Sequence, residues 1–232
     1  MTGCRGSVPL ARNDLTEPGA PRAYPPDLLT PNYLQVDTRR VSEPLDTFNR
    51  ILDAAQELVQ ERGFNKMGHT DISRRLGIRN ASIHYHFAKK AELGVALVYR
   101  YRRHLEAQLR NIDDVGVSPP EQLERYLAAY RAVVHPDGRI CLCTVLAGDY
   151  NTLPEGMQRE VRAFFDLNET WLTRVFAEGR ATQTLRVPDT PEGAAFAFLA
   201  TLEGTMLLAR ASGNVKRFET FAQRSLGVLR MA

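Results

Sequence analysis

The sequence predicts an all-α protein of about nine helices, and three observations lead to that prediction. Apolar residues recur at steps of three and four through most of the chain after residue 44. Prolines and glycines divide this pattern into segments of helical length. We find neither the strict alternation of apolar and polar residues that marks a half-buried strand nor an internal repeat.

The first expected helix begins near Leu45 and ends at Gly63, a C-terminal stop residue. Its apolar face consists of Phe48, Ile51, Leu52, Ala55, Leu58 and Val59. The preceding residues 1–43 hold six prolines and predict a disordered N-terminal extension. The alternative is a basic arm that follows a DNA backbone through Arg39 and Arg40.

Two short helices joined by a sharp turn follow. Thr70 is a residue type favoured as an N-cap, so we expect it to begin the first of them. Ile72 and Leu76 face inward in that helix, and Gly77 permits the turn. Arg79 or Asn80 then opens the second short helix, which ends at His86. This layout is that of a helix-turn-helix.

The second short helix combines a packing stripe with a polar face that can reach base edges in a major groove. Ile83 and Phe87 lie one turn apart and form the stripe. The arginine before this helix can reach a guanine or a phosphate, and the lysines after it can neutralise phosphates. We expect DNA contacts from Thr70, Arg79, Asn80, Ala81, Ser82, His84, Tyr85, His86, Lys89 and Lys90. The alternative is an aromatic core patch beside ordinary surface lysines.

The remaining helices form the larger part of the chain. A long helix at about 88–111 has Leu93, Leu97, Tyr101 and Leu105 on its inner side. Ser118 and two prolines then start another helix. The punctuation by prolines and glycines predicts further helices at about 120–134, 140–149, 155–180, 191–213 and 215–230.

Charge is distributed unevenly along the chain. The 232 residues are 44% apolar and 25% charged, with a formal net charge of +3. Between Glu61 and Arg110, 11 Lys/Arg oppose 4 Asp/Glu, a net +7, so the remainder carries −4. A basic block beside a mildly acidic body favours a polyanionic partner, and a solvated helix face is the alternative explanation.

Other classes of protein fit the residues less well. Three cysteines, Cys4, Cys141 and Cys143, do not make a secreted disulfide framework. No long apolar run and no secretory signal is found, so we expect a cytoplasmic protein without a membrane span. His84 and His86 point to nearly opposite sides of a helix, so we expect no metal or other cofactor. We also expect no enzyme, because no catalytic constellation or phosphate loop is found.

The block ILDAAQELVQERGF, with TDISRRLGI and SIHYHFAKKAEL after it, resembles the N-terminal domain of the TetR family of transcriptional repressors. The match covers about residues 46–97, and the HYHFAKK ending is its most specific part. The resemblance implies that Thr70, His84, Tyr85, His86 and Lys90 touch phosphates or bases. The family commonly has Ser or Thr where Arg79 stands, and often Gly where Ala81 stands.

We therefore expect a helix-turn-helix DNA-binding domain at 44–92 and a ligand-binding and dimerisation domain at 93–232. By the resemblance, an inducer pocket lies between the long fourth helix and helices five to eight. Candidate pocket residues are Tyr99, Tyr126, Tyr130, Cys141, Cys143, Tyr150, Phe165, Trp171 and Glu203. Core packing is the alternative for each aromatic residue. Glu203 is an unusual charge in an apolar helix and is expected to pair with an arginine or, alternatively, to polarise a ligand.

Cys141 and Cys143 follow the turn Pro136–Arg139 at an expected helix start, where the helix N-terminus and an arginine favour a thiolate. Cys141 is the better candidate for a reactive thiol, and the two do not bridge because their Cβ atoms diverge. The alternative is that both are small buried hydrophobes. The run CLCTVLAGDYNTLP resembles a branch of TetR-like proteins. Some members of the wider family respond to small reactive or unsaturated compounds, so an electrophile or a small acid is a hypothesis for the signal.

Small residues lie along one side of the helix at about 191–213 and allow a second helix to approach closely. A homodimer interface is expected at Ala197, Ala200, Thr201, Gly204 and Leu208, with packing against 215–230 as the alternative. A dimer also doubles the DNA that one short recognition helix can read.

Together these features predict a ligand-responsive transcriptional regulator. It is expected to repress by binding a palindromic double-stranded operator through the major groove and to be released by a small-molecule inducer. One alternative is a thiol-based redox or electrophile sensor without a reversible ligand. The other is a helical interaction protein that does not bind DNA.

Overall fold

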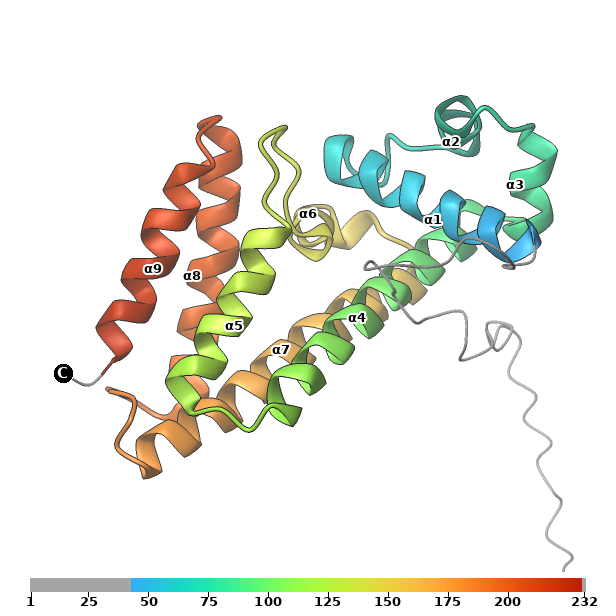
Figure 1. Cartoon of the computed structure of the whole chain (residues 1–232). Helices are drawn as coiled ribbons and strands as arrows, with labels where there is room; N and C mark the ends of the chain where they lie inside the picture. Colours follow the sequence, from blue (N-terminus) through green and yellow to red (C-terminus); the bar gives the residue numbers. More distant parts are fainter. Residues whose placement is uncertain (1–42, 231–232) are drawn as a thin grey trace, which may run out of the picture.

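A computed structural model describes residues 43–230, and the regular elements in this range are helical (Figure 1). The all-α prediction is therefore confirmed. The elements are α1 (Glu43–Arg62), α2 (His69–Leu76), α3 (Asn80–His86), α4 (Lys90–Asp114), α5 (Pro119–Ala132), α6 (Leu142–Gly148), the 3-10 turn η2 (Tyr150–Thr152), α7 (Glu155–Ala181), α8 (Pro191–Ala211) and α9 (Lys216–Leu229). The predicted extension, with Cys4, Arg39 and Arg40, lies outside the described residues.

The helices form two groups that α4 joins. Helices α1, α2 and α3 pack together at one end of the molecule (Figure 1). Helix α4 starts there and runs along α7, while α5, α8 and α9 lie beside one another at the other end. Because α4 belongs to both groups, a displacement along it changes how the first group sits on the second.

The inner face of α1 is the one that its apolar spacing predicts. Its six buried apolar residues are Ile51, Leu52, Ala54, Ala55, Leu58 and Val59. The half-buried Phe48 stacks on Phe87, with ring centroids 5.0 Å apart. Gly63 ends the helix with a φ of +83°, a conformation that costs little only for glycine.

The starts of α2 and α4 are among those that differ from the expected positions. The N-cap of α2 is Gly68 rather than Thr70, which lies inside the first turn. The Asp71 carboxylate explains the shift, because it accepts a 2.9 Å hydrogen bond from the Gly68 amide. Helix α4 begins at Lys90 rather than near residue 88, and there Glu92 accepts from the amide of the N-cap Lys89 at 3.4 Å.

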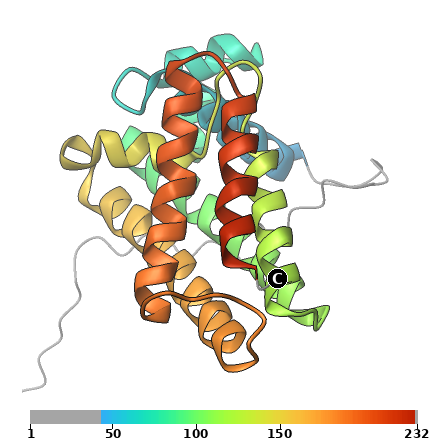
Figure 2. The same ribbon diagram turned by 90° about the vertical axis from the view of Figure 1, so that its left-hand side faces the viewer.

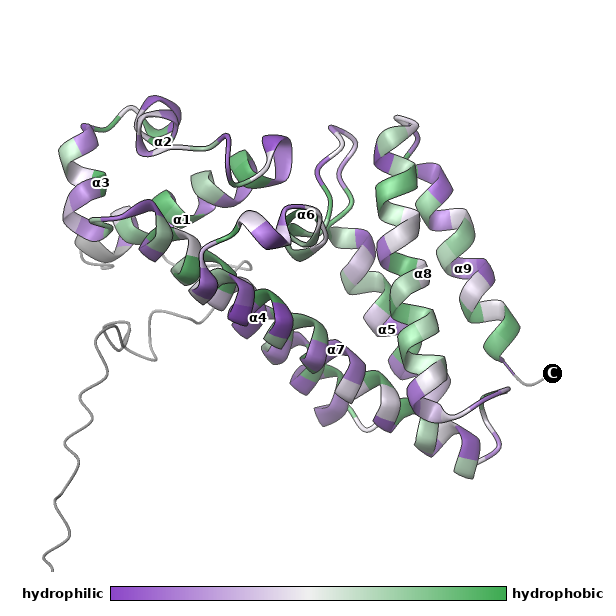
Figure 3. Ribbon diagram, turned by 180° about the vertical axis from the view of Figure 1, so that it is seen from behind, coloured by the Kyte–Doolittle hydropathy of each residue, from purple (hydrophilic) through white to green (hydrophobic). Residues whose placement is uncertain are grey.

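Helices α8 and α9 present an open face to solvent (Figure 2). Phe196 and Leu208 on α8 are 62% and 61% exposed, and Val228 on α9 is 66% exposed. Hydropathy colouring shows that α8 is mostly apolar along its length (Figure 3). By length and composition alone, α8 is apolar enough to cross a membrane. Its buried side, which includes Phe198 and Leu202, packs in the core.

Candidate functional site

The turn between α2 and α3 is held by its own backbone. Gly77 has a φ of +66° and donates its amide to the Ser73 carbonyl. The Ser73 hydroxyl donates to the carbonyl of Ile78 at 2.6 Å, so the chain leaving the turn is tied back to α2. A rigid turn of this kind fixes the angle at which α3 leaves α2.

Helix α3 has the packing stripe and the exposed face that its sequence predicts. Ile83 and Phe87 are fully buried, whereas Tyr85 is 82% exposed. The Tyr85 ring touches the neighbouring His86 ring edge-on, with centroids 5.1 Å apart, and most of its surface faces water. It is free to contact an external surface.

The predicted DNA-contact residues fall into two sets. The exposed ones are Thr70, Arg79, Asn80, Ala81, His84, Tyr85 and Lys89. The half-buried ones are Ser82, His86 and Lys90. The exposed set surrounds the N-terminal end of α2 and the outer side of α3, so it forms one surface of the first helical group.

His86 and Lys90 are partly held by neighbouring rings. The His86 ring lies edge-on to Phe48, with centroids 6.1 Å apart, and burial lowers its pKa. The Lys90 ammonium donates to the Asn65 carbonyl at 3.2 Å and lies 4.5 Å from the centroid of Phe64. Burial lowers its pKa as well. Both side chains are thus held in place by contacts within the chain.

His69 contacts the predicted residue His84, a contact that the sequence pattern did not predict. Its Nδ1 lies 3.4 Å from Nε2 of His84, and the two rings meet edge-on. Burial lowers the pKa of His69, and the nearby His84 lowers it further. This contact joins the first residue of α2 to the exposed face of α3. No spacing rule brings together two residues on different short helices.

A second cluster of polar side chains is buried where α5, α6, α7 and α8 meet. Tyr126 and Tyr130 on α5 reach the Asn168 amide oxygen at 2.6 and 3.2 Å. Tyr130 also reaches Glu203 on α8 at 3.1 Å, and Thr144 on α6 contacts the other oxygen of Glu203. We call these five residues the core polar cluster. Thr144 and Asn168 were not predicted, because single polar residues on apolar helix faces give no spacing signal.

Among residues 43–230, Glu203 does not pair with an arginine, so the structure contradicts that expectation. Its partners are two neutral hydroxyls. Burial raises the pKa of its carboxyl group from 4.5 to about 7, although both hydrogen bonds act in the opposite direction. A carboxyl group taken out of water without a cation favours its neutral form.

The structure contradicts the hypothesis of a thiolate at Cys141 and agrees with the alternative, that Cys141 and Cys143 are small buried side chains. Cys141 and Cys143 are free thiols and are fully buried. No disulfide joins these two residues. Burial and, to a smaller extent, the nearby Glu203 raise the pKa of Cys141 to about 12; burial also raises the pKa of Cys143. Arg139, expected to favour a thiolate, instead pairs with Asp137 and Glu57.

Trp171 packs against the core polar cluster, but three other predicted pocket residues make their contacts elsewhere. The Trp171 ring stacks on Tyr126 with centroids 5.3 Å apart. Tyr99 lies under the Arg102 guanidinium, and Tyr150 accepts from Arg162 at 2.7 Å. Phe165 meets Phe164 edge-on. Their contacts are those of ordinary packing and surface pairing.

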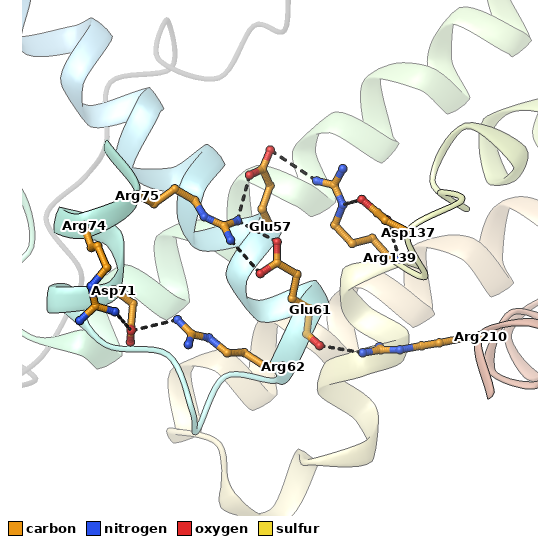
Figure 4. Close-up of polar contacts among 9 residues, drawn as sticks. All are labelled: Glu57, Glu61, Arg62, Asp71, Arg74, Arg75, Asp137, Arg139 and Arg210. Carbon is orange, nitrogen blue, oxygen red and sulfur yellow. Dashed lines mark hydrogen bonds and ion pairs between the residues drawn. The ribbon is translucent and has the colours of Figure 1, made fainter. Parts of the chain in front are cut away.

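The two helical groups are joined next to the core polar cluster. The Gln60 side chain on α1 donates to the carbonyl of Ile140 at 2.6 Å, a buried hydrogen bond. Arg139 pairs with Glu57 at 3.4 Å, and Arg210 on α8 donates to the Glu61 carbonyl at 3.0 Å (Figure 4). All three contacts fall on the last two turns of α1.

Known proteins resemble this chain both in sequence and in fold. The family described as "Bacterial regulatory proteins, tetR family" matches residues 51–97. A TetR-family transcriptional regulator from Agrobacterium tumefaciens is 35% identical, and the match covers 81% of this chain and 100% of that one, with a TM-score of 0.77.

Two curated proteins are similar over shorter stretches. The transcriptional regulator AcuR of Cereibacter sphaeroides is 26% identical over 166 residues, which are 69% of this chain and 74% of that protein. The HTH-type transcriptional repressor KstR2 of Mycobacterium tuberculosis is 28% identical over 109 residues, 47% of this chain and 50% of that protein.

Proposed function

Because this chain belongs to the TetR family of bacterial transcriptional regulators, we propose that it is a dimeric repressor that a small molecule releases from its operator. The observation that supports DNA contact most strongly is the contrast within α3. Tyr85 is 82% exposed, while Ile83 and Phe87 on either side of it are fully buried. A helix held so firmly on one side is suited to enter a major groove with the other.

The contacts divide by their chemistry. Thr70 lies in the first turn of α2, where free backbone amides favour a phosphate oxygen. Lys89 and Lys90 at the start of α4 supply positive charge for the backbone. Arg79, Ser82, His84 and Tyr85 stand where base edges would lie. We propose that the first set positions the protein on DNA and the second reads the sequence.

We propose that two copies of the chain associate through the open face of α8 and α9. Ala197, Ala200, Thr201 and Leu208 are exposed, and Gly204 is half-buried. Phe196, Phe221 and Val228 extend the same apolar character beyond the predicted residues. A homodimer interface buries exposed apolar side chains such as these. Their burial between two copies also explains why α8 is as apolar as a membrane-spanning helix.

We propose that the inducer acts on the core polar cluster, close to the contacts that α1 makes with Arg139, Ile140 and Arg210. The buried thiols argue against the rival proposal of a sensor that is covalently modified. A reversible ligand that favours one arrangement of the helices needs no reactive group.

Footprinting on the DNA that flanks its own gene tests the proposal. We expect two protected half-sites separated by about one helical turn, roughly 34–36 Å, as a twofold dimer requires. Protection should weaken steeply as salt rises. A protein that protects no part of this DNA, even at low salt, does not support the proposal.

A further inference from the structure

The core polar cluster contains more oxygen contacts than its hydroxyl groups have protons. Four pairs of oxygens lie in hydrogen-bond contact: Tyr126 with Asn168, Tyr130 with Asn168, Tyr130 with Glu203, and Thr144 with Glu203. If each contact is an ordinary two-centre hydrogen bond, the four contacts need four protons, and the three hydroxyl groups supply three. A carboxylate supplies none.

The Asn168 amide cannot supply the missing proton. Its nitrogen donates to the Phe164 carbonyl at 2.8 Å, which fixes the orientation of the amide. Turning the amide over would set two acceptor oxygens against each other. The fourth proton therefore belongs on Glu203, which then donates to Tyr130, and Tyr130 in turn donates to Asn168.

In the part of the chain that the structure describes, the surroundings of Glu203 contain no cation that would hold it ionised. Within residues 43–230, burial, Thr144 and Tyr130 are the influences on its ionisation. The titratable groups that face it are Tyr126 and Tyr130 from α5 and Cys141 and Cys143 from the start of α6. Burial raises the pKa of all four, so each is neutral near neutral pH. From α7 the facing group is Asn168, which does not titrate.

We propose that Glu203 holds a proton in the folded protein, and that its ionisation is a switch that weakens operator binding as the pH rises. This inference rests on the proposed function as a DNA-binding regulator. Ionisation leaves one oxygen contact of the cluster without a proton and places a charge in the apolar interior. Both effects favour an arrangement in which α5, α6 and α8 separate.

Residues 140–144 carry such a movement to the DNA-binding helices. Thr144, which contacts Glu203, lies in the first turn of α6, four residues after Ile140, whose carbonyl accepts from Gln60. A second route uses α8 itself, because Arg210 lies about two turns beyond Glu203 and donates to the Glu61 carbonyl.

The contact region continues from α1 to α2 (Figure 4). Arg75 on α2 binds both oxygens of Glu61 at 2.8 Å and also reaches Glu57 at 3.1 Å. Glu57 is the residue that Arg139 contacts. A shift of residues 139–144 therefore reaches the helix that precedes the recognition helix.

The protonation is measured on the wild-type protein through its single tryptophan. Trp171 stacks on Tyr126 and reports the state of the cluster. Between about pH 5.5 and pH 8.5 we expect a one-proton transition in Trp171 fluorescence. We also expect a protonated-carboxyl band in the infrared spectrum that disappears over the same range. Glu203→Gln should remove both, whereas Glu192→Gln, an exposed residue of the same helix, should keep both.

Coupling to DNA is measured by fluorescence anisotropy with the fragment found by footprinting. We expect the dissociation constant of the wild type to rise about fivefold or more over this range, relative to Glu203→Gln. The comparison with this variant removes the effect of the histidines near the DNA surface. Gln60→Leu should keep the Trp171 transition but respond less in DNA affinity.

Each result decides the proposal. A wild-type protein without the infrared band, or a fluorescence transition that persists in Glu203→Gln, overturns the protonation of Glu203. Equal pH dependence of DNA affinity in the wild type and Glu203→Gln overturns the coupling. Failure to bind the DNA at any pH overturns the proposed function itself, and the spectroscopic result still stands separately.

Discussion

Gln60 donates a 2.6 Å hydrogen bond to the carbonyl oxygen of Ile140, 80 residues further along the chain. The Gln60 side chain is almost completely buried, so this bond joins the DNA-binding helices to the larger group of helices away from water. Replacement of Gln60 by leucine, of similar size, leaves the Ile140 carbonyl without this partner.

We therefore expect Gln60→Leu to lower the free energy of unfolding by about 1–3 kcal/mol. Urea denaturation measures the change. The exposed Gln223→Leu on α9 serves as control. Equal stability of the two variants would show that the bond contributes nothing to holding the two groups together.

The stability of the protein should depend on pH through Glu203. The pKa of this carboxyl is 4.5 when exposed and about 7 in the folded protein. An acid with a raised folded pKa binds its proton more tightly when folded, so its stabilisation is complete below about pH 4.5 and is lost as the pH rises to about 7. The loss corresponds to about 3 kcal/mol.

The difference in free energy of unfolding between the wild type and Glu203→Gln isolates this effect from other carboxyl groups. It should fall across that window and stay constant above it. A difference that does not vary with pH would mean that Glu203 ionises as an exposed glutamate does.

Substitutions at Tyr85 and Ile83 should distinguish an effect on DNA binding from an effect on stability. Tyr85→Ala removes an exposed ring, so stability should change by less than about 0.5 kcal/mol while DNA affinity falls. Ile83→Ala opens a cavity in the core and should lower the free energy of unfolding by about 2–5 kcal/mol. Thermal denaturation and anisotropy titration measure the two effects. Full DNA affinity in Tyr85→Ala would exclude this ring from the interface.

The open face of α8 predicts a specific dimer variant. Leu208→Asp places a charge within the proposed interface and should shift the protein from dimer to monomer at micromolar concentration. Val115→Asp is the matched control, because Val115 is also exposed, at 54%, but lies at the end of α4. Sedimentation equilibrium gives the mass directly. A dimeric Leu208→Asp protein would place the interface elsewhere.

Cys141 and Cys143 should be unreactive in the folded protein. Both thiols are buried, and burial raises the pKa of each, so the thiolate that alkylating reagents attack is scarce. Mass mapping after brief iodoacetamide treatment should find neither modified until urea is added. Modification of Cys141 before unfolding would restore the covalent-sensor alternative.

The comparison of prediction and structure shows where sequence patterns are informative. Periodicity located the nine α-helices in the described range and the buried stripe of Ile83 and Phe87, because burial on a helix imposes a regular spacing. The N-cap of α2 was misplaced, because Asp71 decides it by reaching back to Gly68. That choice depends on a local contact rather than on the preference of Thr70 alone.

The core polar cluster was predicted only in part, for a different reason. Tyr126, Tyr130 and Glu203 were predicted as pocket residues because they carry polar groups in apolar helices. Their partners Asn168 and Thr144 come from other helices, and only the packing of four helices brings them together. The same packing buries Cys141. Its place beside a helix N-terminus was expected to lower the pKa of its thiol, but burial raises this pKa instead.

The short stretch between Ile140 and Thr144 has an evolutionary consequence. Its two ends are anchored to different helices, by Gln60 on α1 and by Glu203 on α8. One inserted residue would lengthen the connection between the two anchors by up to about 3.8 Å, one Cα–Cα step, so the two anchors could not be kept together. Insertions are tolerated in most surface connections. Here we expect related sequences to change the composition of the preceding turn while the length of these five residues stays constant.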